Sequence, residues 1–178
     1  MTGIVLQLDC NRIHRYCGAL CLIDKNVFGN DSWTRENFER QVPGKSELSR
    51  VAFFERKPLG YLIASRYPDR CAHIHRLVVS CDFRSKGIGT RLLHSFERAC
   101  LRMGVEHVTL ESLRSRDDAN RFYERMGFRR ISGEELLDYL RRKARVNDMQ
   151  RYYEASSIGD SLVYSKLITS APACEEGC

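Results

Sequence analysis

The stretch Arg84-Ser85-Lys86-Gly87-Ile88-Gly89-Thr90 joins two segments of different character. Before it, residues 72–79 have the length and the β-branched and aliphatic residues of a strand. After it, apolar residues recur at helical spacing until Gly104, a residue that favours the end of a helix. The pattern predicts a strand, a glycine-rich turn and a long amphipathic helix, in that order.

This turn has the features of an anion-binding site. The first N–H groups of a helix lack partners within the helix, and the helix dipole makes that end positive. Gly87 and Gly89 allow close approach of the backbone to an anion, and Arg84 and Lys86 add positive charge. The stretch has neither the Gly-Lys-Ser/Thr of a nucleotide P-loop nor the Gly-x-Gly-x-x-Gly of a dinucleotide site. Phosphate binding is one interpretation, and an ordinary turn is the other.

The rest of the chain alternates between short strand patterns and helical ones. Strands are expected at 4–8, 49–55, 59–65, 105–112, 128–131 and 162–168, with 56–58 as a hairpin turn. Helices are expected at 11–28, from Ser32 as N-cap to about Val42, from Asp117 or Asp118 as N-cap to Gly127, and at 134–145. This order predicts a mixed α/β fold in which residues 1–170 form one domain and residues 171–178 a flexible tail.

Composition narrows the class of protein. The 178 residues are 43% hydrophobic and 29% charged, which is typical of a globular domain. No apolar run is long enough to cross a bilayer and no secretion signal is present, so we expect a cytoplasmic protein without a membrane partner. The net charge of +6 fits a polyphosphate cofactor or an acidic partner. Because no nucleic-acid-binding motif occurs, nucleic acid is not expected as a partner.

Eight cysteines raise the question of a metal site. Six of them fall inside or directly beside expected strands or helices, where we interpret the thiol as a small buried hydrophobe. Cys71, His73, His75 and Cys81 contain metal-ligand types, but no Cys-x-x-Cys pair accompanies them. We therefore predict no metal.

Two motifs together resemble a known family. The turn matches Arg/Gln-x-x-Gly-x-Gly/Ala, and residues 119–128 match Ala-x-x-x-Tyr-x-x-x-Gly-Phe. Both are similar to motifs of the GNAT superfamily of N-acetyltransferases, and the resemblance covers about residues 4–168. It implies a mostly antiparallel mixed sheet of about six to seven strands with helices on both faces. It also implies acetyl-CoA as the cofactor and an amine as the acetyl acceptor.

A narrower resemblance points to one subgroup. Trp33 followed by Phe38, Glu111 twelve positions before Tyr123, and the pair Tyr152-Tyr153 are similar to features of bacterial ribosomal-protein-alanine N-acetyltransferases and their eukaryotic N-terminal relatives. The chain departs from that subgroup at Arg116, where an Asn is usual, and in a long segment before Tyr152. The resemblance implies the N-terminal α-amine of a protein or peptide as the acceptor.

The chemistry of amide formation requires a base for the acceptor and an acid for the departing thiolate. Glu111 is the candidate base, on the same strand face as Thr109, and Tyr123 is the candidate acid because a phenol is protonated at neutral pH. His73 and His75 are alternative bases. The resemblance assigns the cofactor to Leu77, Val78, Val79, Arg84, Ser85, Lys86, Gly87, Ile88, Gly89 and Thr90, and the acceptor to Trp33, Tyr152 and Tyr153. Asn120, one turn from Tyr123, is a further cofactor candidate or a surface residue, and His75 on its strand is a further candidate for the acceptor pocket.

Residues 133–160 are predicted to be a helical insertion between the last two strands that forms the wall of the acceptor pocket. Leu136, Leu137 and Leu140 are expected to dock on the protein. Arg141, Arg142, Lys143 and Arg145 are expected to point outward and to favour acidic peptides. Two other functions stay open: acetylation of a small amine, an antibiotic or a lysine side chain, and a non-catalytic acyl-CoA sensor or adaptor.

Overall fold

The computed structural model describes residues 3–146 and 160–169. Its strands are β1 (Ile4–Gln7), β2 (Arg50–Phe54), β3 (Lys57–Tyr67), β4 (Cys71–Val79), β5 (His107–Leu113), β6 (Arg129–Arg130) and β7 (Ser161–Leu167). Its α-helices are α1 (Cys10–Phe28), α2 (Arg35–Glu39), α3 (Lys45–Leu48), α4 (Ile88–Arg102), α5 (Asp117–Arg125) and α6 (Gly133–Arg145), with 3₁₀ turns at Gly29–Asp31 and Cys81–Phe83.

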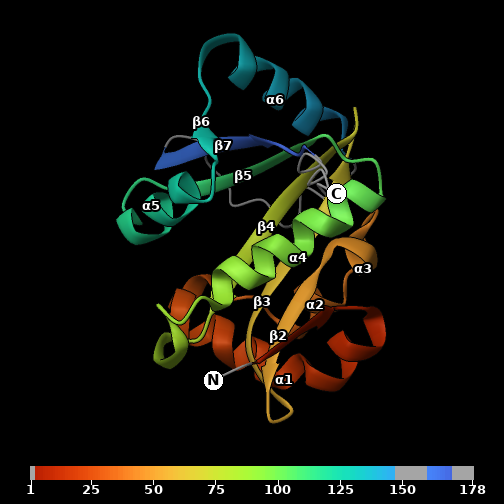
Figure 1. Ribbon diagram of the computed structural model, residues 1–178, viewed down its shortest axis with the longest axis vertical. Helices are drawn as coiled ribbons and strands as arrows, with labels where there is room; N and C mark the ends of the chain where they lie inside the picture. The colour runs from red at the N-terminus through yellow and green to blue at the C-terminus, as the bar shows by residue number, and fades with distance from the viewer. Residues whose placement is uncertain (1–2, 147–159, 170–178) are drawn as a thin grey trace, which may run out of the picture.

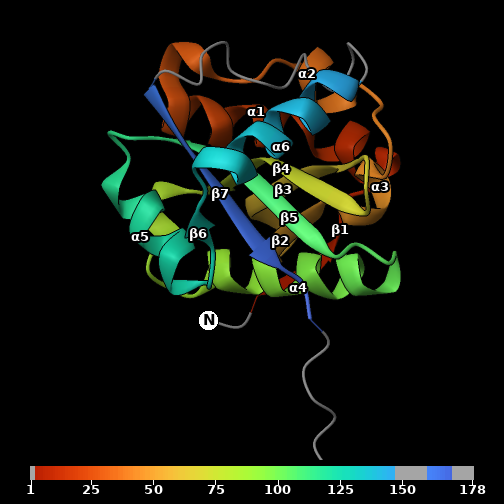
Figure 2. The same cartoon turned by 90° about the horizontal axis from the view of Figure 1, so that it is seen from above.

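The strands form a seven-stranded sheet in the order β1-β2-β3-β4-β5-β7-β6 (Figure 1). Only the β4–β5 pair is parallel among the pairings of the described residues. Figure 2 shows α4 on one face of the sheet and α1 and α6 on the other. The predicted class, a mixed and mostly antiparallel sheet with helices on both faces, is confirmed.

Each face has its own apolar core. On one face, Leu92, Phe96 and Cys100 of α4 pack over Leu62 and Ile74 of the sheet, and all five are buried. On the opposite face, α1 packs against β2 and β3. The helical spacing of apolar residues in α4 explains this arrangement, since one stripe of the helix faces the sheet. Among the described residues, no helix combines the length and the low polarity needed to span a membrane.

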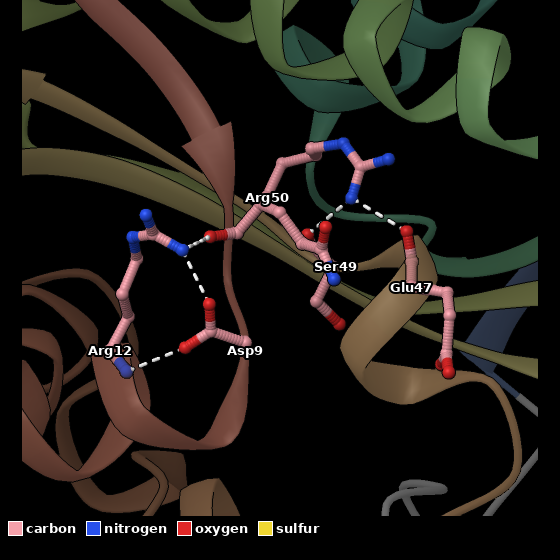
Figure 3. A network of polar contacts seen from close by, with 6 residues as sticks. Asp9, Arg12, Glu47, Ser49 and Arg50 are labelled. Carbon is pink, nitrogen blue, oxygen red and sulfur yellow. Dashed lines mark hydrogen bonds and ion pairs between the residues drawn. The ribbon is translucent and has the colours of Figure 1, made fainter.

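Polar groups fix the start of α1 and its neighbouring strand. Asp9 caps α1 by accepting a hydrogen bond from the Arg12 N–H at 2.8 Å, and its other oxygen is ion-paired with the Arg12 guanidinium (Figure 3). Arg50 of β2 is buried, and its Nη1 donates to the carbonyls of Glu47 and Ser49 at 2.7 and 2.6 Å. These bonds close the corner where β1 runs into α1 and α3 runs into β2.

Two predicted helix caps are wrong. Ser32 does not cap α2, because its backbone is extended and the N–H of Trp33 donates to the buried carboxylate of Asp24. Helix α2 begins only after Thr34, whose N–H donates to Asn37 Oδ1 at 2.8 Å. Neither Asp117 nor Asp118 caps α5, whose N-cap is Arg116. Both aspartates instead lie in the first turn, where the helix dipole favours negative charge.

The expected docking face of α6 is also corrected. Leu136 and Leu140 pack against the small core of Ile131 and Val163, but Leu137 is 52% exposed. The fully buried residue of the helix is Tyr139. The periodicity predicted the helix correctly, but it assigned Leu137 to the buried face, where the structure has Tyr139.

Candidate active site

A cleft opens where β4 and β5 separate. Their parallel pairing runs from Cys71↔His107 to Ile74↔Leu110, and beyond those pairs the two strands diverge. The cleft has a volume of about 940 Å³. Three elements supply most of its lining: the end of β4, the turn into α4, and α5 with the residues just before it. The sheet edge that β4 exposes after Ile74 therefore faces a cavity.

Most of the residues predicted to bind the cofactor line this cleft. They are Leu77, Val78, Val79, Arg84, Ser85, Gly87, Ile88, Gly89 and Thr90. Lys86 lies on the other side of the turn, where it lines a small cavity with Gly3 and Arg91 and donates to the Asp82 carbonyl at 3.1 Å. The backbone of the turn thus faces the cleft, although one of its two cations does not.

The backbone of the turn requires a glycine at position 87. Gly87 is the N-cap of α4 with φ +74°, the left-handed region that side chains rarely adopt, and a Cβ placed there would meet no atom within 4 Å. A Cβ on Gly89 would lie 3.4 Å from the ring of Phe122, an ordinary contact distance, so Gly89 lies where α4 and α5 meet. The result is an open helix N-terminus with exposed N–H groups at the cleft wall.

Tyr123 brings a protonated phenol to the cleft. The residue is 8% exposed, and its ring packs against Phe128 and Tyr164 with centroids 5.9 and 6.0 Å away. Among the described residues its hydroxyl has no hydrogen-bond partner. Burial raises the pKa of Tyr123 to about 12, while the charge of Arg116 opposes the shift. The group is therefore a proton donor across the physiological range.

Asn120 lies beneath the cleft rather than on its wall. Its Nδ2 donates to the carbonyls of Leu113 and Arg114 at 3.1 and 3.3 Å, and its Oδ1 is buried without a partner among the described residues. These bonds hold the connection between β5 and α5. Since Tyr123 follows on the same helix one turn later, Asn120 positions the phenol.

Glu111 is held by α6. Its Oε1 accepts hydrogen bonds from Tyr139 Oη at 2.7 Å and from Lys143 Nζ at 2.6 Å. It is not among the residues that line the cleft, and both of its partners belong to α6, which lies on the face of the sheet opposite to α4 (Figure 2). The predicted outward basic face of α6 is corrected at Lys143, which points inward, and at Arg142, which is half-buried. Arg141 and Arg145 are exposed as predicted, and they are paired with Asp138 and Asp69.

The two histidines of β4 are neutral, and His73 is buried while His75 is half-buried. The Nδ1 of His73 hydrogen-bonds Thr109 at 2.9 Å, and its ring stacks on Tyr67 with centroids 4.9 Å apart. Burial lowers the pKa of His73 to about 3, and Lys143 adds to the shift. Burial also holds the pKa of His75 well below its usual value, with His73, Lys45 and Lys143 as further causes. Neither imidazole has the basicity of a general base near pH 7.

We predict that these histidines make the fold sensitive to acid. Below its usual pKa of 6.5 the unfolded imidazole takes up a proton, whereas folded His73 resists protonation down to about pH 3. The contribution of neutral His73 to the free energy of unfolding is therefore fully present above pH 6.5. It declines as the pH falls toward 3, by about 1.4 kcal/mol per pH unit for such a group. Urea unfolding at pH 6, 5 and 4 measures the slope. His73→Gln should make it shallower, and an unchanged slope contradicts the assignment.

Of the four residues predicted to bind the acceptor, the structure describes two, Trp33 and His75. Trp33 is 7% exposed and packs on Phe38, with ring centroids 5.5 Å apart, in the core under α1. His75 is bonded to Ser65 at 2.8 Å on the buried face of the sheet. Tyr152 and Tyr153 lie outside the described residues, as does the predicted tail. The zinc interpretation finds no grouping of three metal-ligand side chains in residues 3–146 and 160–169.

Sequence reasoning missed the two arginines, Arg116 and Arg76, that stack on Phe28 next to the cleft. The guanidinium carbon of Arg116 lies 4.3 Å from the ring centroid of Phe28, and that of Arg76 lies 3.8 Å from the same centroid. Arg76 is paired with the buried Asp24, at 3.3 Å. Arg116 has no carboxylate partner among the described residues and lines the cleft beside Tyr123. The position of Arg116 directly before α5 was the signal that could have placed it near the cleft. Its contact with Phe28 could not be predicted, because Phe28 is distant in the sequence.

Comparisons with known proteins agree on fold and family. The family described as acetyltransferase (GNAT) family matches residues 20–128. No curated protein sequence matches this chain. Among solved structures, the ribosomal-protein-S18-alanine N-acetyltransferase from Escherichia coli is similar with a TM-score of 0.68 and 18% identity, over 97% of this chain and 98% of that one.

Two further structures are similar at the same level. Ard1 from Thermoplasma volcanium has a TM-score of 0.69 and 17% identity, over 96% of this chain and all of its own (100%). A chain of the NatC complex bound to Gag peptide and CoA has a TM-score of 0.69 and 19% identity, over 95% of this chain and 100% of its own. At these identities the likeness concerns the fold.

Proposed function

Because this chain belongs to the acetyltransferase (GNAT) family, we propose that it transfers the acetyl group of acetyl-CoA to the N-terminal α-amine of a protein or peptide. The observation that carries the proposal is the cleft between the diverging strands β4 and β5, which has a helix N-terminus at one wall and the phenol of Tyr123 at another. The choice of acceptor is supported by the names of similar structures, which include a ribosomal-protein-alanine N-acetyltransferase and a complex bound to a peptide.

The residues of the cleft fit the cofactor. Acetyl-CoA supplies the acetyl group as a thioester and carries a diphosphate. The open N-terminus of α4, where a Cβ on Gly87 would project into empty space, suits a diphosphate, and Arg84 adds charge beside it. The exposed edge of β4 at Leu77 to Val79 offers backbone groups to the amide arm and to the thioester carbonyl.

Two groups divide the proton transfers. Tyr123 holds its proton at neutral pH and donates it to the departing sulfur, because burial keeps the phenol neutral until an anion forms beside it. Glu111 takes the proton of the acceptor amine, directly or through a water molecule. Oε1 of Glu111 accepts hydrogen bonds from two side chains of α6, and its Oε2 accepts none from the described residues.

The test is an acetylation assay with release of free thiol as the readout. A library of peptides with unblocked N-termini is compared with polyamines, aminoglycosides and a peptide whose only amine is a lysine side chain. We expect turnover to be highest with unblocked peptide N-termini. Preference for a small amine or for the lysine peptide contradicts the proposed acceptor. Binding of acetyl-CoA without thiol release in every arm favours the sensor function instead.

A further inference from the structure

The candidate base already has an ammonium ion bound to it. Lys143 Nζ lies 2.6 Å from Oε1 of Glu111, and Tyr139 Oη lies 2.7 Å from the same oxygen. The side chains of Lys143 and Glu111 are 16% and 12% exposed, so water screens the pair only weakly. A general base must lie within hydrogen-bond reach of the proton that it removes, and a primary amine from α6 occupies that place.

The position of Glu111 in the sheet makes this contact relevant to the acceptor. Glu111 follows Leu110, the last residue of β5 to pair with β4, and so lies where the two strands begin to diverge. Its partner on β7 is the apolar Val163. The neighbouring imidazole of His73 is neutral. Lys143 is therefore the described cation in direct contact with the carboxylate.

Charge balance restricts what can replace Lys143. A half-buried carboxylate that loses its counter-ion is left uncompensated, which is unfavourable. An aliphatic or N-terminal amine is largely protonated when it reaches the enzyme near pH 7. Such an acceptor can replace one ammonium ion by another, whereas an uncharged acceptor cannot. The exchange leaves the net charge around Glu111 unchanged.

We propose that Lys143 occupies the position on Glu111 that the acceptor ammonium takes, so that acceptor binding exchanges one ammonium ion for another. The proposal rests on the proposed function and specifies its substrate class. The enzyme selects acceptors that arrive as cations, and α6 sets this selection by competing for the same carboxylate. Tyr139 keeps its hydrogen bond to Oε1 throughout and positions Glu111 for the incoming amine.

The test is Lys143→Met, which keeps most of the aliphatic stem and removes the charge. The acceptor is a peptide that begins with an unblocked alanine. Its uncharged counterpart is the same peptide with lactate as the first residue, used as a competitive inhibitor. We expect the KM of the alanine peptide to fall about tenfold, the worth of one hydrogen bond to a charged group. The inhibition constant of the lactate peptide should change less than about twofold, because an uncharged ligand does not gain the freed carboxylate.

Three further variants keep the result interpretable. Arg141→Met removes a cation of α6 that is paired with Asp138 on its exposed side, and it should leave both constants unchanged. Lys143→Arg keeps a cation on Glu111 and should keep the wild-type KM. In a Glu111→Gln background, Lys143→Met should no longer lower the KM, since coupled residues give non-additive effects. Acetyl-CoA affinity, measured in each variant, verifies that the protein is folded.

The outcomes separate this inference from the function on which it rests. Turnover in the wild type together with an unchanged or raised KM in Lys143→Met overturns the inference alone. An equal fall for the alanine and lactate peptides also overturns it, because that result indicates a sterically opened pocket. Absence of thiol release with every amine, in the wild type and in Arg141→Met, overturns the proposed function and the inference together.

Discussion

Replacing Tyr123 with Phe is expected to lower turnover about 10²- to 10⁴-fold while leaving acetyl-CoA affinity close to that of the wild type. The substitution keeps the ring that packs against Phe128 and Tyr164 and removes only the hydroxyl. That hydroxyl lines the cleft and carries a proton whose pKa burial raises to about 12. Without it the thiolate departs into a cleft that lacks the proposed proton donor.

The matched control is Tyr164→Phe. Tyr164 is fully buried beside Tyr123, and its hydroxyl lies 3.3 Å from Glu124, away from the cleft lining. Loss of this second phenol should change turnover only slightly. Single-turnover kinetics with saturating acetyl-CoA separate the chemical step from binding. If Tyr123→Phe retains more than about half of the wild-type turnover, another group supplies the proton, because a general acid is worth at least about 10²-fold.

Replacing Gly87 with Val is expected to weaken acetyl-CoA binding by about 30-fold or more, the worth of one or two charge-assisted hydrogen bonds. The added side chain projects from the N-cap of α4 into the space where an anion approaches. A β-branched residue at φ +74° also strains the turn and moves its N–H groups. Isothermal titration with CoA measures the loss directly.

A second glycine provides the control for strain. Gly133 also has a positive φ, +55°, and a Cβ added there meets nothing within 4 Å. It begins α6, outside the lining of the cleft. Gly133→Val should therefore cost similar stability and leave CoA affinity unchanged. Equal affinities for CoA in the two variants would show that the diphosphate does not lie on this turn.

The elements around the cleft were accessible to sequence reasoning because their signals are local. Helix α4 follows from its apolar stripe, and the turn before it follows from Gly87 and Gly89. The cap of α2 was missed because a distant carboxylate, Asp24, takes the N–H that follows Ser32. Propensity identifies residues able to cap a helix, but a tertiary hydrogen bond decides which one does.

The surroundings of Glu111 illustrate the same limit at the site. Strand alternation correctly placed its side chain on the face shared with Thr109. Its partners Tyr139 and Lys143 lie about thirty residues later, on a helix whose charges suggest a solvated face. Arg116 stacking on Phe28 is a similar case. Pairings of this kind depend on how helices pack on the sheet, and no periodicity in the sequence encodes them.

The short parallel seam between β4 and β5 has a further consequence for motion. Main-chain bonds from Cys71↔His107 to Ile74↔Leu110 connect two antiparallel units, β1 to β4 and β5 with β7 and β6. Local opening costs less where fewer backbone hydrogen bonds must break, and separating the two units requires breaking the main-chain bonds of only these four residue pairs. A ligand in the cleft contacts the end of β4 and also α5, which follows β5. Acetyl-CoA bound in the cleft as proposed therefore contacts both units beyond these pairs, and its binding disfavours their separation.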